Sequence, residues 1–99
     1  MNDARPELPD AERLQTWLGQ HVVVDTLGLQ IYIGVLSGLD AAFFQLDDAD
    51  VHDVRDSRDT KEQYIHNTRK LGHSANRRSV LIYKHQVVSL SRLDDIIRF

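Results

Sequence analysis

The sequence predicts a mostly β domain, in which a short N-terminal helix precedes five strands that form a strongly bent antiparallel sheet and close as a small barrel. Three observations support this prediction. Runs rich in Val, Ile, Leu and Phe recur at 21–26, 29–38, 41–46, 80–83 and 87–90. Glycines stand inside or at the end of the second run, where a missing side chain permits sharp bending. Only a short polar elbow separates the last two runs, so they meet at a corner.

The bulk properties limit the classes of function. A chain of 99 residues makes one domain with a modest core, for which a partner subunit is useful. No cysteine is present, which excludes disulfides and thiol chemistry. The formal net charge of −3 gives no bulk attraction to nucleic acid, so any such site is local. Without a signal peptide or long apolar run, we expect a cytoplasmic protein that does not enter a membrane.

The N-terminal part predicts a tail and a helix. Residues 1–9 are polar, contain two prolines and are expected to be a flexible tail. A helix is predicted over 10–19, with Asp10 as its cap and Gly19 as its end. Its single apolar stripe is Leu14, Trp17 and Leu18. We interpret Trp17 as a lid on the core, because burying one indole outweighs other uses of so few apolar positions.

The predicted strands differ in the cover that they need. In the run 41–46, Phe43 and Phe44 point to opposite faces, so one is core and the other needs a partner. In the run 80–83, alternation also makes both faces largely apolar. One face can pack into a barrel, while the other face and the strand edge need a lid or a second chain.

The segment 47–78 is the polar part of the chain. Seven acidic residues lie between positions 47 and 62, and the later basic residues are Arg69, Lys70, Arg77 and Arg78. The two halves can attract each other, or the basic end can contact RNA. We predict a long variable loop between the third and fourth strands, with a mobile tip.

Taken in order, the motifs resemble those of the Sm-like family, which includes Sm and LSm proteins and bacterial Hfq. The first motif is seen in Leu18-Gly19, Val22, Val24, Gly28, Gly34, Leu36, Gly38, Asp40 and 46–49, and the second in 80–90. The resemblance covers 14–93 and implies one Sm-like domain over 1–99, an SH3-like barrel. Tyr83-Lys84-His85 looks like the Hfq signature, whereas the long 47–78 segment looks like the expanded loop of Sm and LSm proteins.

The resemblance implies binding of single-stranded, uridine-rich RNA at the inner rim of a ring. The residues that match the family's RNA-binding positions are Asp40, Tyr83, Lys84 and His85. The chain departs from the pattern at Ala41-Ala42, where the family has a stacking aromatic and an amide. Stacking contributes about 1–3 kcal/mol per base, so we expect weak binding unless Phe43 or Tyr83 supplies the ring. Alternatively, Asp40 caps its turn and the elbow is solvent-exposed or contacts a subunit.

The resemblance also implies assembly into a closed homo-hexamer or homo-heptamer, because in the family the fourth strand pairs with the neighbour's fifth strand. The implied subunit interface is Val80, Leu81, Ile82, Val87, Val88 and Leu90.

No sequence feature indicates an enzyme, a cofactor or a metal. The histidines at 52, 66 and 73 lack ligand spacing, and no nucleophile and base pair stands out. Two hypotheses remain. The protein is a ring-forming RNA-binding protein, or it is an Sm-like oligomer with a degenerate RNA pocket that holds protein partners through 47–78.

Overall fold

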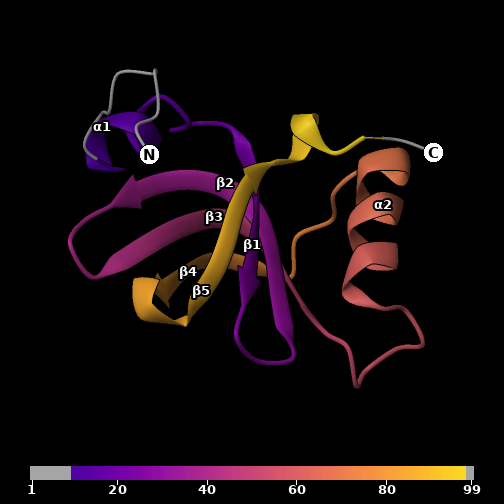
Figure 1. Cartoon of the computed structure of the whole chain (residues 1–99). Helices are drawn as coiled ribbons and strands as arrows, with labels where there is room; N and C mark the ends of the chain where they lie inside the picture. Colours follow the sequence, from indigo (N-terminus) through magenta and orange to yellow (C-terminus); the bar gives the residue numbers. More distant parts are fainter. Residues whose placement is uncertain (1–9, 98–99) are drawn as a thin grey trace, which may run out of the picture.

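The computed structural model describes residues 10–97, which form one five-stranded antiparallel sheet with a helix on either side (Figure 1). The elements are α1 (Asp10–Gln15), β1 (His21–Thr26), β2 (Gln30–Leu39), β3 (Phe43–Asp53), α2 (Lys61–Leu71), β4 (Arg77–Tyr83), η1 (Lys84–Gln86), β5 (Val87–Arg92) and η2 (Leu93–Asp95). The tail predicted at residues 1–9 lies outside the described residues. The predicted fold class, a short helix followed by five antiparallel strands, is confirmed.

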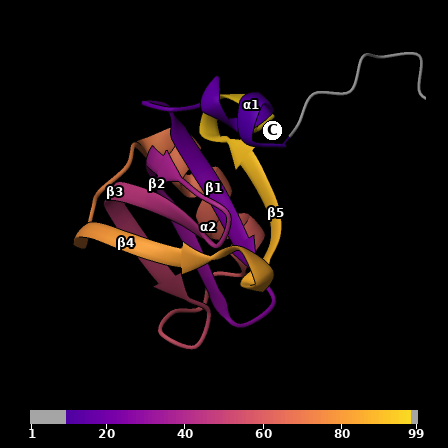
Figure 2. The ribbon, with the colours of Figure 1, turned by 90° about the vertical axis from the view of Figure 1, so that its left-hand side faces the viewer.

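The strand order in the sheet is β4-β3-β2-β1-β5, so the last two strands lie at its two edges. Figure 2 shows these edge strands on two sides of the curled sheet, meeting at the η1 elbow. The pairing of β2 with β3 shifts register between Ile33 and Val35 and again between Leu36 and Gly38, which bends both strands. Gly34 lies at the first shift, where a Cβ atom would come within 3.0 Å of the backbone of Ala49. Only glycine fits this close approach.

The predicted closure of the sheet into a barrel is not seen in residues 10–97, where β4 and β5 form the two edges of the sheet and do not pair with each other. The inner face of the curled sheet nevertheless holds a core of the kind that a barrel encloses, the barrel core. Its buried residues come from β1, β2, β3 and β4 and are Val22, Val24, Leu36, Phe44, Leu46, Ala49 and Ile82. Leu14 and Trp17 pack against this core, so Trp17 covers the barrel as predicted. The helix itself is shorter than the predicted 10–19. It ends at Gln15, and the chain continues in a turn to Gly19, which has a positive φ of 85°.

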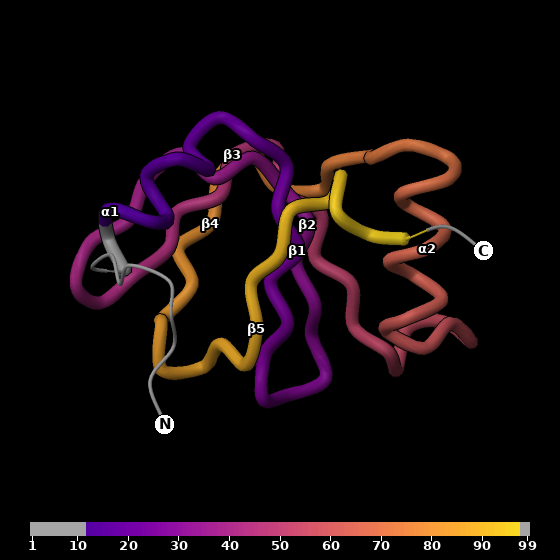
Figure 3. Tube along the Cα trace, turned by 45° about the horizontal axis from the view of Figure 1, so that its top comes forward, coloured from indigo at the N-terminus to yellow at the C-terminus, as the bar shows by residue number. Residues whose placement is uncertain are grey.

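A second apolar core lies on the outer face of the same strands. Val23, Ile31 and Ile33 are buried there against Ile65 of α2, and Tyr64, Leu93 and Ile96 pack around them. Because Val23 lies between two residues of the barrel core, β1 is buried on both faces. Figures 1 and 3 show the consequence: α1 and α2 lie at opposite ends of the molecule with the strands between them.

The prediction of a long loop over 47–78 is corrected by the structure. Strand β3 continues to Asp53, α2 occupies Lys61–Leu71, and β4 begins at Arg77. The local chemistry explains the helix. Thr60 and Gln63 form a capping box at its start, and the backbone N–H of Gly72 donates to Thr68 at its end.

Polar contacts fasten α2 to the sheet. The ammonium group of Lys61 donates to Asp25 Oδ1 at 2.6 Å and to the carbonyl oxygens of Thr26 and Gly28 at 3.0 and 2.8 Å. The hydroxyl of Tyr64 donates to the carboxylate of Asp50 in β3. Burial and this carboxylate together raise the pKa of Tyr64 above its ordinary value. The helix is therefore held by charge as well as by apolar contact.

The expected attraction within 47–78 is not observed. In the part of the chain that the structure describes, no ion pair joins the acidic residues of this segment to Arg69, Lys70, Arg77 or Arg78. An ion pair that does form within 47–78 joins neighbours in its acidic half, Asp53 and Arg55, at 2.7 Å. None of the helices between residues 10 and 97 has the length and apolar character needed to cross a membrane.

Candidate nucleic-acid interface

The turn at 39–43, between β2 and β3, is organised by Asp40. Its Oδ1 atom accepts hydrogen bonds from the backbone N–H groups of Ala42 and Phe43, both at 2.8 Å. These two bonds lower the pKa of the exposed Asp40 carboxyl, with a smaller contribution from the positive charge of Lys84. Asp40 thus caps its own turn, the alternative role that the sequence left open.

The elbow between β4 and β5 is joined directly to this turn. The backbone N–H of Lys84 donates to the carbonyl oxygen of Ala42 at 2.8 Å. On its other side, the carbonyl oxygen of Gln86 accepts from the N–H of Leu27 in the β1–β2 turn, at 2.9 Å. Two loops far apart in the sequence therefore hold the elbow by main-chain contacts, which do not depend on its side chains.

Three rings follow one another across this junction. The Tyr83 ring lies 4.5 Å from the Phe43 ring and 5.3 Å from the His85 ring, measured between centroids and with tilted planes in both cases. The Tyr83 side chain remains 53% exposed. The Lys84 ammonium lies 5.1 Å from the centroid of the buried Phe44 ring, within cation–π range. The junction thus combines an exposed aromatic ring, a cation and an imidazole.

All four residues predicted as an RNA site therefore meet at one place, because Asp40 contributes the turn and Tyr83, Lys84 and His85 contribute the elbow. Ala41 and Ala42 are exposed and supply no ring. Phe43, which comes next, points its half-buried ring at Tyr83. The sequence raised Phe43 only as a substitute, and its pairing with Tyr83 across β3 and β4 depends on a strand register that alternation does not reveal.

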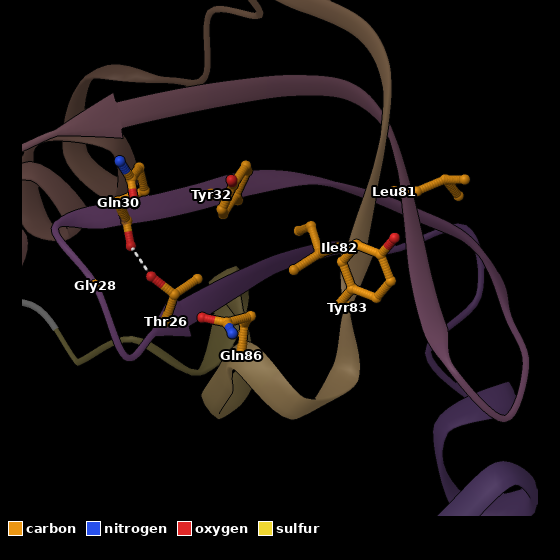
Figure 4. Close-up of a pocket in the computed structure, with 8 residues that line it drawn as sticks. All are labelled: Thr26, Gly28, Gln30, Tyr32, Leu81, Ile82, Tyr83 and Gln86. Atoms are coloured by element: carbon orange, nitrogen blue, oxygen red, sulfur yellow. Dashed lines mark hydrogen bonds between the residues drawn. The ribbon is translucent and has the colours of Figure 1, made fainter.

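Two hollows flank β4 near the junction. One has a volume of 160 Å³ and is lined by Thr26, Gly28, Gln30, Tyr32, Leu81, Ile82, Tyr83 and Gln86. Figure 4 shows it between the β1–β2 hairpin and β4, with the hydroxyl of Thr26 donating to the carbonyl oxygen of Gln30 at 2.6 Å. The other has a volume of 240 Å³ and is lined by Gly38, Leu39, Asp40, Phe43, Gln45 and Leu81. Sequence reasoning missed both, because they depend on the packing of three strands.

The residues predicted as a subunit interface fall into two groups. Val80, Ile82, Val87 and Leu90 pack into or against the barrel core. Leu81 and Val88 point outward, and their side chains are 58% and 59% exposed. Val88 lies at a register shift, where no residue of β1 is opposite it. The exposed apolar surface of both edge strands is therefore concentrated at these two positions and at Tyr83.

The histidines of the 47–78 segment serve different parts of the fold. The His52 ring stacks on Tyr64 with centroids 4.2 Å apart, and the His73 ring meets the His21 ring edge-on at 5.2 Å. No group of three potential metal-binding side chains comes together between residues 10 and 97.

Comparison with known proteins identifies the fold. No family model and no curated protein sequence matches the chain. Among solved structures, it is similar to the Sm protein of Pyrococcus abyssi in complex with a uridine heptamer, with a TM-score of 0.59 and 15% sequence identity. The match covers 86% of this chain and 99% of the Pyrococcus chain. The chain therefore has the Sm-like fold that its motifs predict.

Proposed function

We propose that this protein is a cytoplasmic, ring-forming and non-catalytic RNA-binding protein that binds single-stranded RNA at the junction of the Asp40 turn and the Tyr83 elbow. The observation that carries this proposal is the direct main-chain link between the two loops, from Lys84 N–H to Ala42 O at 2.8 Å. It fixes an exposed ring and two basic side chains in one place, which favours binding of a flexible, charged polymer.

Each side chain has a chemical part in this proposal. The exposed ring of Tyr83 offers a face on which a base stacks. Lys84 and His85 offer donors to phosphate or to a base edge, and Asp40 holds the turn rather than the RNA. The solved Sm structure with the same fold contains a uridine heptamer. We therefore expect uridine-rich RNA to occupy the junction.

The ring is part of the proposal, because a single junction without the missing aromatic binds weakly. Edge strands with exposed Leu81 and Val88 need partners, and a head-to-tail contact between β4 and β5 of adjacent copies closes a hexamer or heptamer. Several weak junctions on one ring then act together on one RNA. Light scattering tests this step: a mass of one 11.4 kDa chain at micromolar concentration contradicts it.

The RNA-binding step is tested with a fluorescent 15-nucleotide oligo-U at two salt concentrations. Replacing Lys84 by alanine removes one phosphate contact, so affinity falls and the slope of log K against log salt flattens by about 0.7. Lys70→Ala is the matched control, because it removes the same charge from the exposed side of α2. Absence of sub-millimolar binding at low salt rejects the proposal, and equal slopes for both variants remove Lys84 from the interface.

A second candidate function is a ring that holds protein partners and binds no RNA. The exposed Ala41 and Ala42 favour it, because they stand where the family carries its stacking ring and amide. In that case α2 and its flanking loops, within 47–78, form the partner surface. A ring of the expected mass that binds no oligonucleotide supports this candidate.

A further inference from the structure

The ammonium group of Lys61, at the start of α2, is fully occupied inside the fold. It donates to Asp25 Oδ1 at 2.6 Å and to the carbonyl oxygens of Thr26 and Gly28 at 3.0 and 2.8 Å. An ammonium group has three protons, so these three acceptors use all of them. Lys61 therefore has no proton left for a phosphate, and its role lies in the turn that it holds.

One peptide unit of this turn faces both α2 and the η1 elbow, and Figures 1 and 3 show the turn between these two elements. The peptide bond between Thr26 and Leu27 is trans, so its C=O and N–H groups point in opposite directions. Its carbonyl oxygen accepts from Lys61, and its N–H donates to the carbonyl oxygen of Gln86 at 2.9 Å. One rigid group thus connects the helix to the elbow.

The connection continues into the proposed RNA site. The elbow is the three-residue turn Lys84–Gln86, held at its other end by the bond from Lys84 N–H to Ala42 O at 2.8 Å. Because the elbow is so short, loss of the contact at Gln86 changes the directions in which Lys84 and His85 point. The cation at the Thr26 carbonyl oxygen also polarises the peptide unit, which makes its N–H a stronger donor to Gln86.

We propose that Lys61 is a positioning residue for the RNA site, because it docks α2 on the turn that holds the elbow and so couples helix docking to RNA binding. The inference rests on the proposed RNA-binding function. Coupling between two sites is reciprocal. RNA bound at the elbow therefore strengthens the docking of α2, and loss of the Lys61 ammonium weakens RNA binding without removing any contact to RNA.

The first test measures the affinity of the intact protein for fluorescent 15-nucleotide oligo-U at two salt concentrations. Lys61→Met keeps the apolar stem and removes the ammonium, so affinity should fall about three- to tenfold, the effect of one hydrogen bond. The slope of log K against log salt should not change, because Lys61 contacts no phosphate.

Two matched controls lie on the same helix. Tyr64→Phe removes the hydrogen bond from α2 to Asp50 but leaves the turn in place, so it should not lower the affinity. Lys70→Met removes the same charge from the exposed side of α2 and measures the effect of charge alone.

Hydrogen exchange gives a second readout. The N–H of Leu27 should exchange faster in Lys61→Met than in Tyr64→Phe, because only the first variant releases the turn. In the wild type, saturating oligo-U should slow exchange in Lys61–Leu71, as reciprocal coupling requires. This last measurement needs no variant, so it decides the question even if Lys61→Met folds poorly.

The outcomes separate this inference from the proposed function. The inference is overturned, with RNA binding intact, if Lys61→Met binds oligo-U no more weakly than Lys70→Met or if its salt slope flattens. It is also overturned if Tyr64→Phe loses as much affinity as Lys61→Met, or if oligo-U leaves exchange in α2 of the wild type unchanged. If the wild type binds no oligo-U, the proposed function fails and the inference fails with it.

Discussion

The two apolar cores of this protein lie on opposite faces of the same strands but are built differently. The barrel core draws buried residues from four strands that are distant in sequence, and α1 only covers it. The outer core has three buried residues of β1 and β2, and Ile65 is the buried residue that α2 adds to them. The first core is shared by all the strands of the sheet. The second depends on α2, which lies between β3 and β4 in the sequence.

The outer face also differs along its own length. At one end, α2 covers Val23, Ile31 and Ile33, whose side chains are at most 3% exposed. At the other end, Leu81 and Tyr83 are more than half exposed, and the 240 Å³ hollow lies beside them. Apolar side chains left uncovered beside a hollow are where we expect a ligand or partner to pack. The helix thus leaves open the part of the face that borders the proposed RNA junction.

The largest expected effect is on the barrel core. Leu46 of β3 is completely buried in the barrel core, so Leu46→Ala leaves a cavity and lowers the free energy of unfolding by about 2–5 kcal/mol. Both cores and the junction then unfold together, because every strand shares this core. Urea denaturation followed by tryptophan fluorescence measures the loss. A change below about 1 kcal/mol contradicts a central role for this residue.

A smaller effect is expected for the outer core. Ile65→Ala removes the buried anchor of α2 and weakens helix docking by about 2 kcal/mol. A helix of 11 residues is marginal alone, so we expect α2 to unfold locally while the barrel stays folded. Hydrogen exchange should become faster in Lys61–Leu71 and remain slow in β3. Equal acceleration in both elements indicates that the two cores are one cooperative unit.

The same contrast explains which parts of the fold the sequence predicts. The strands that build the barrel carry β-branched runs and correctly placed glycines, and Gly34 is required by the backbone of Ala49. The first two strands are found within one residue of their predicted bounds. The third strand continues beyond its predicted end, to Asp53. The charged residues Asp47, Asp48 and Asp50 interrupt the apolar pattern that indicates a strand. Asp48 has a positive φ of 47°, which marks an irregularity that alternation does not predict.

The inserted helix was missed because its apolar stripe is very short. Ile65 and Thr68 are its buried residues, and the rest of its inner surface is the polar pair Lys61 and Tyr64. Two signals were nevertheless present. Thr60 and Gln63 have capping-box spacing, and Gly72 follows the last turn. The valine run of β1 also has both faces apolar, which requires a cover on the outer side as well.

The candidate site was predicted in its residues but not in its shape. Asp40, Tyr83, Lys84 and His85 follow from motif order, and they meet in the structure. The hollow beside them depends on the outward direction of Gln45, which follows from the register of β3 against β2 and β4. Register is a property of the folded sheet, so the motif alone does not contain it.

The smallest expected effect concerns the hydroxyl of Tyr64, which donates to Asp50 across the outer core. Tyr64→Phe removes this hydrogen bond and should weaken α2 docking by about 1 kcal/mol at neutral pH. Burial and the Asp50 carboxylate raise the pKa of Tyr64 in the folded state. The stabilisation is therefore complete below the ordinary tyrosine pKa of about 10 and is lost as the pH rises toward the folded value.

The wild type and Tyr64→Phe should thus differ most at about pH 8 and converge above about pH 10, because only the wild type has a phenol to ionise. Hydrogen exchange in α2, corrected for the intrinsic rate at each pH, measures docking in both proteins. Other groups that titrate in alkali affect both proteins alike, so they cancel in the difference. The buried residues of the barrel core carry no titratable side chain, and the Tyr32 that packs against them is present in both proteins, so protection of this core should change alike in the two. If the difference in α2 docking between the two proteins stays constant from pH 8 to 11, the hydrogen bond from the Tyr64 hydroxyl to Asp50 does not hold α2 on β3.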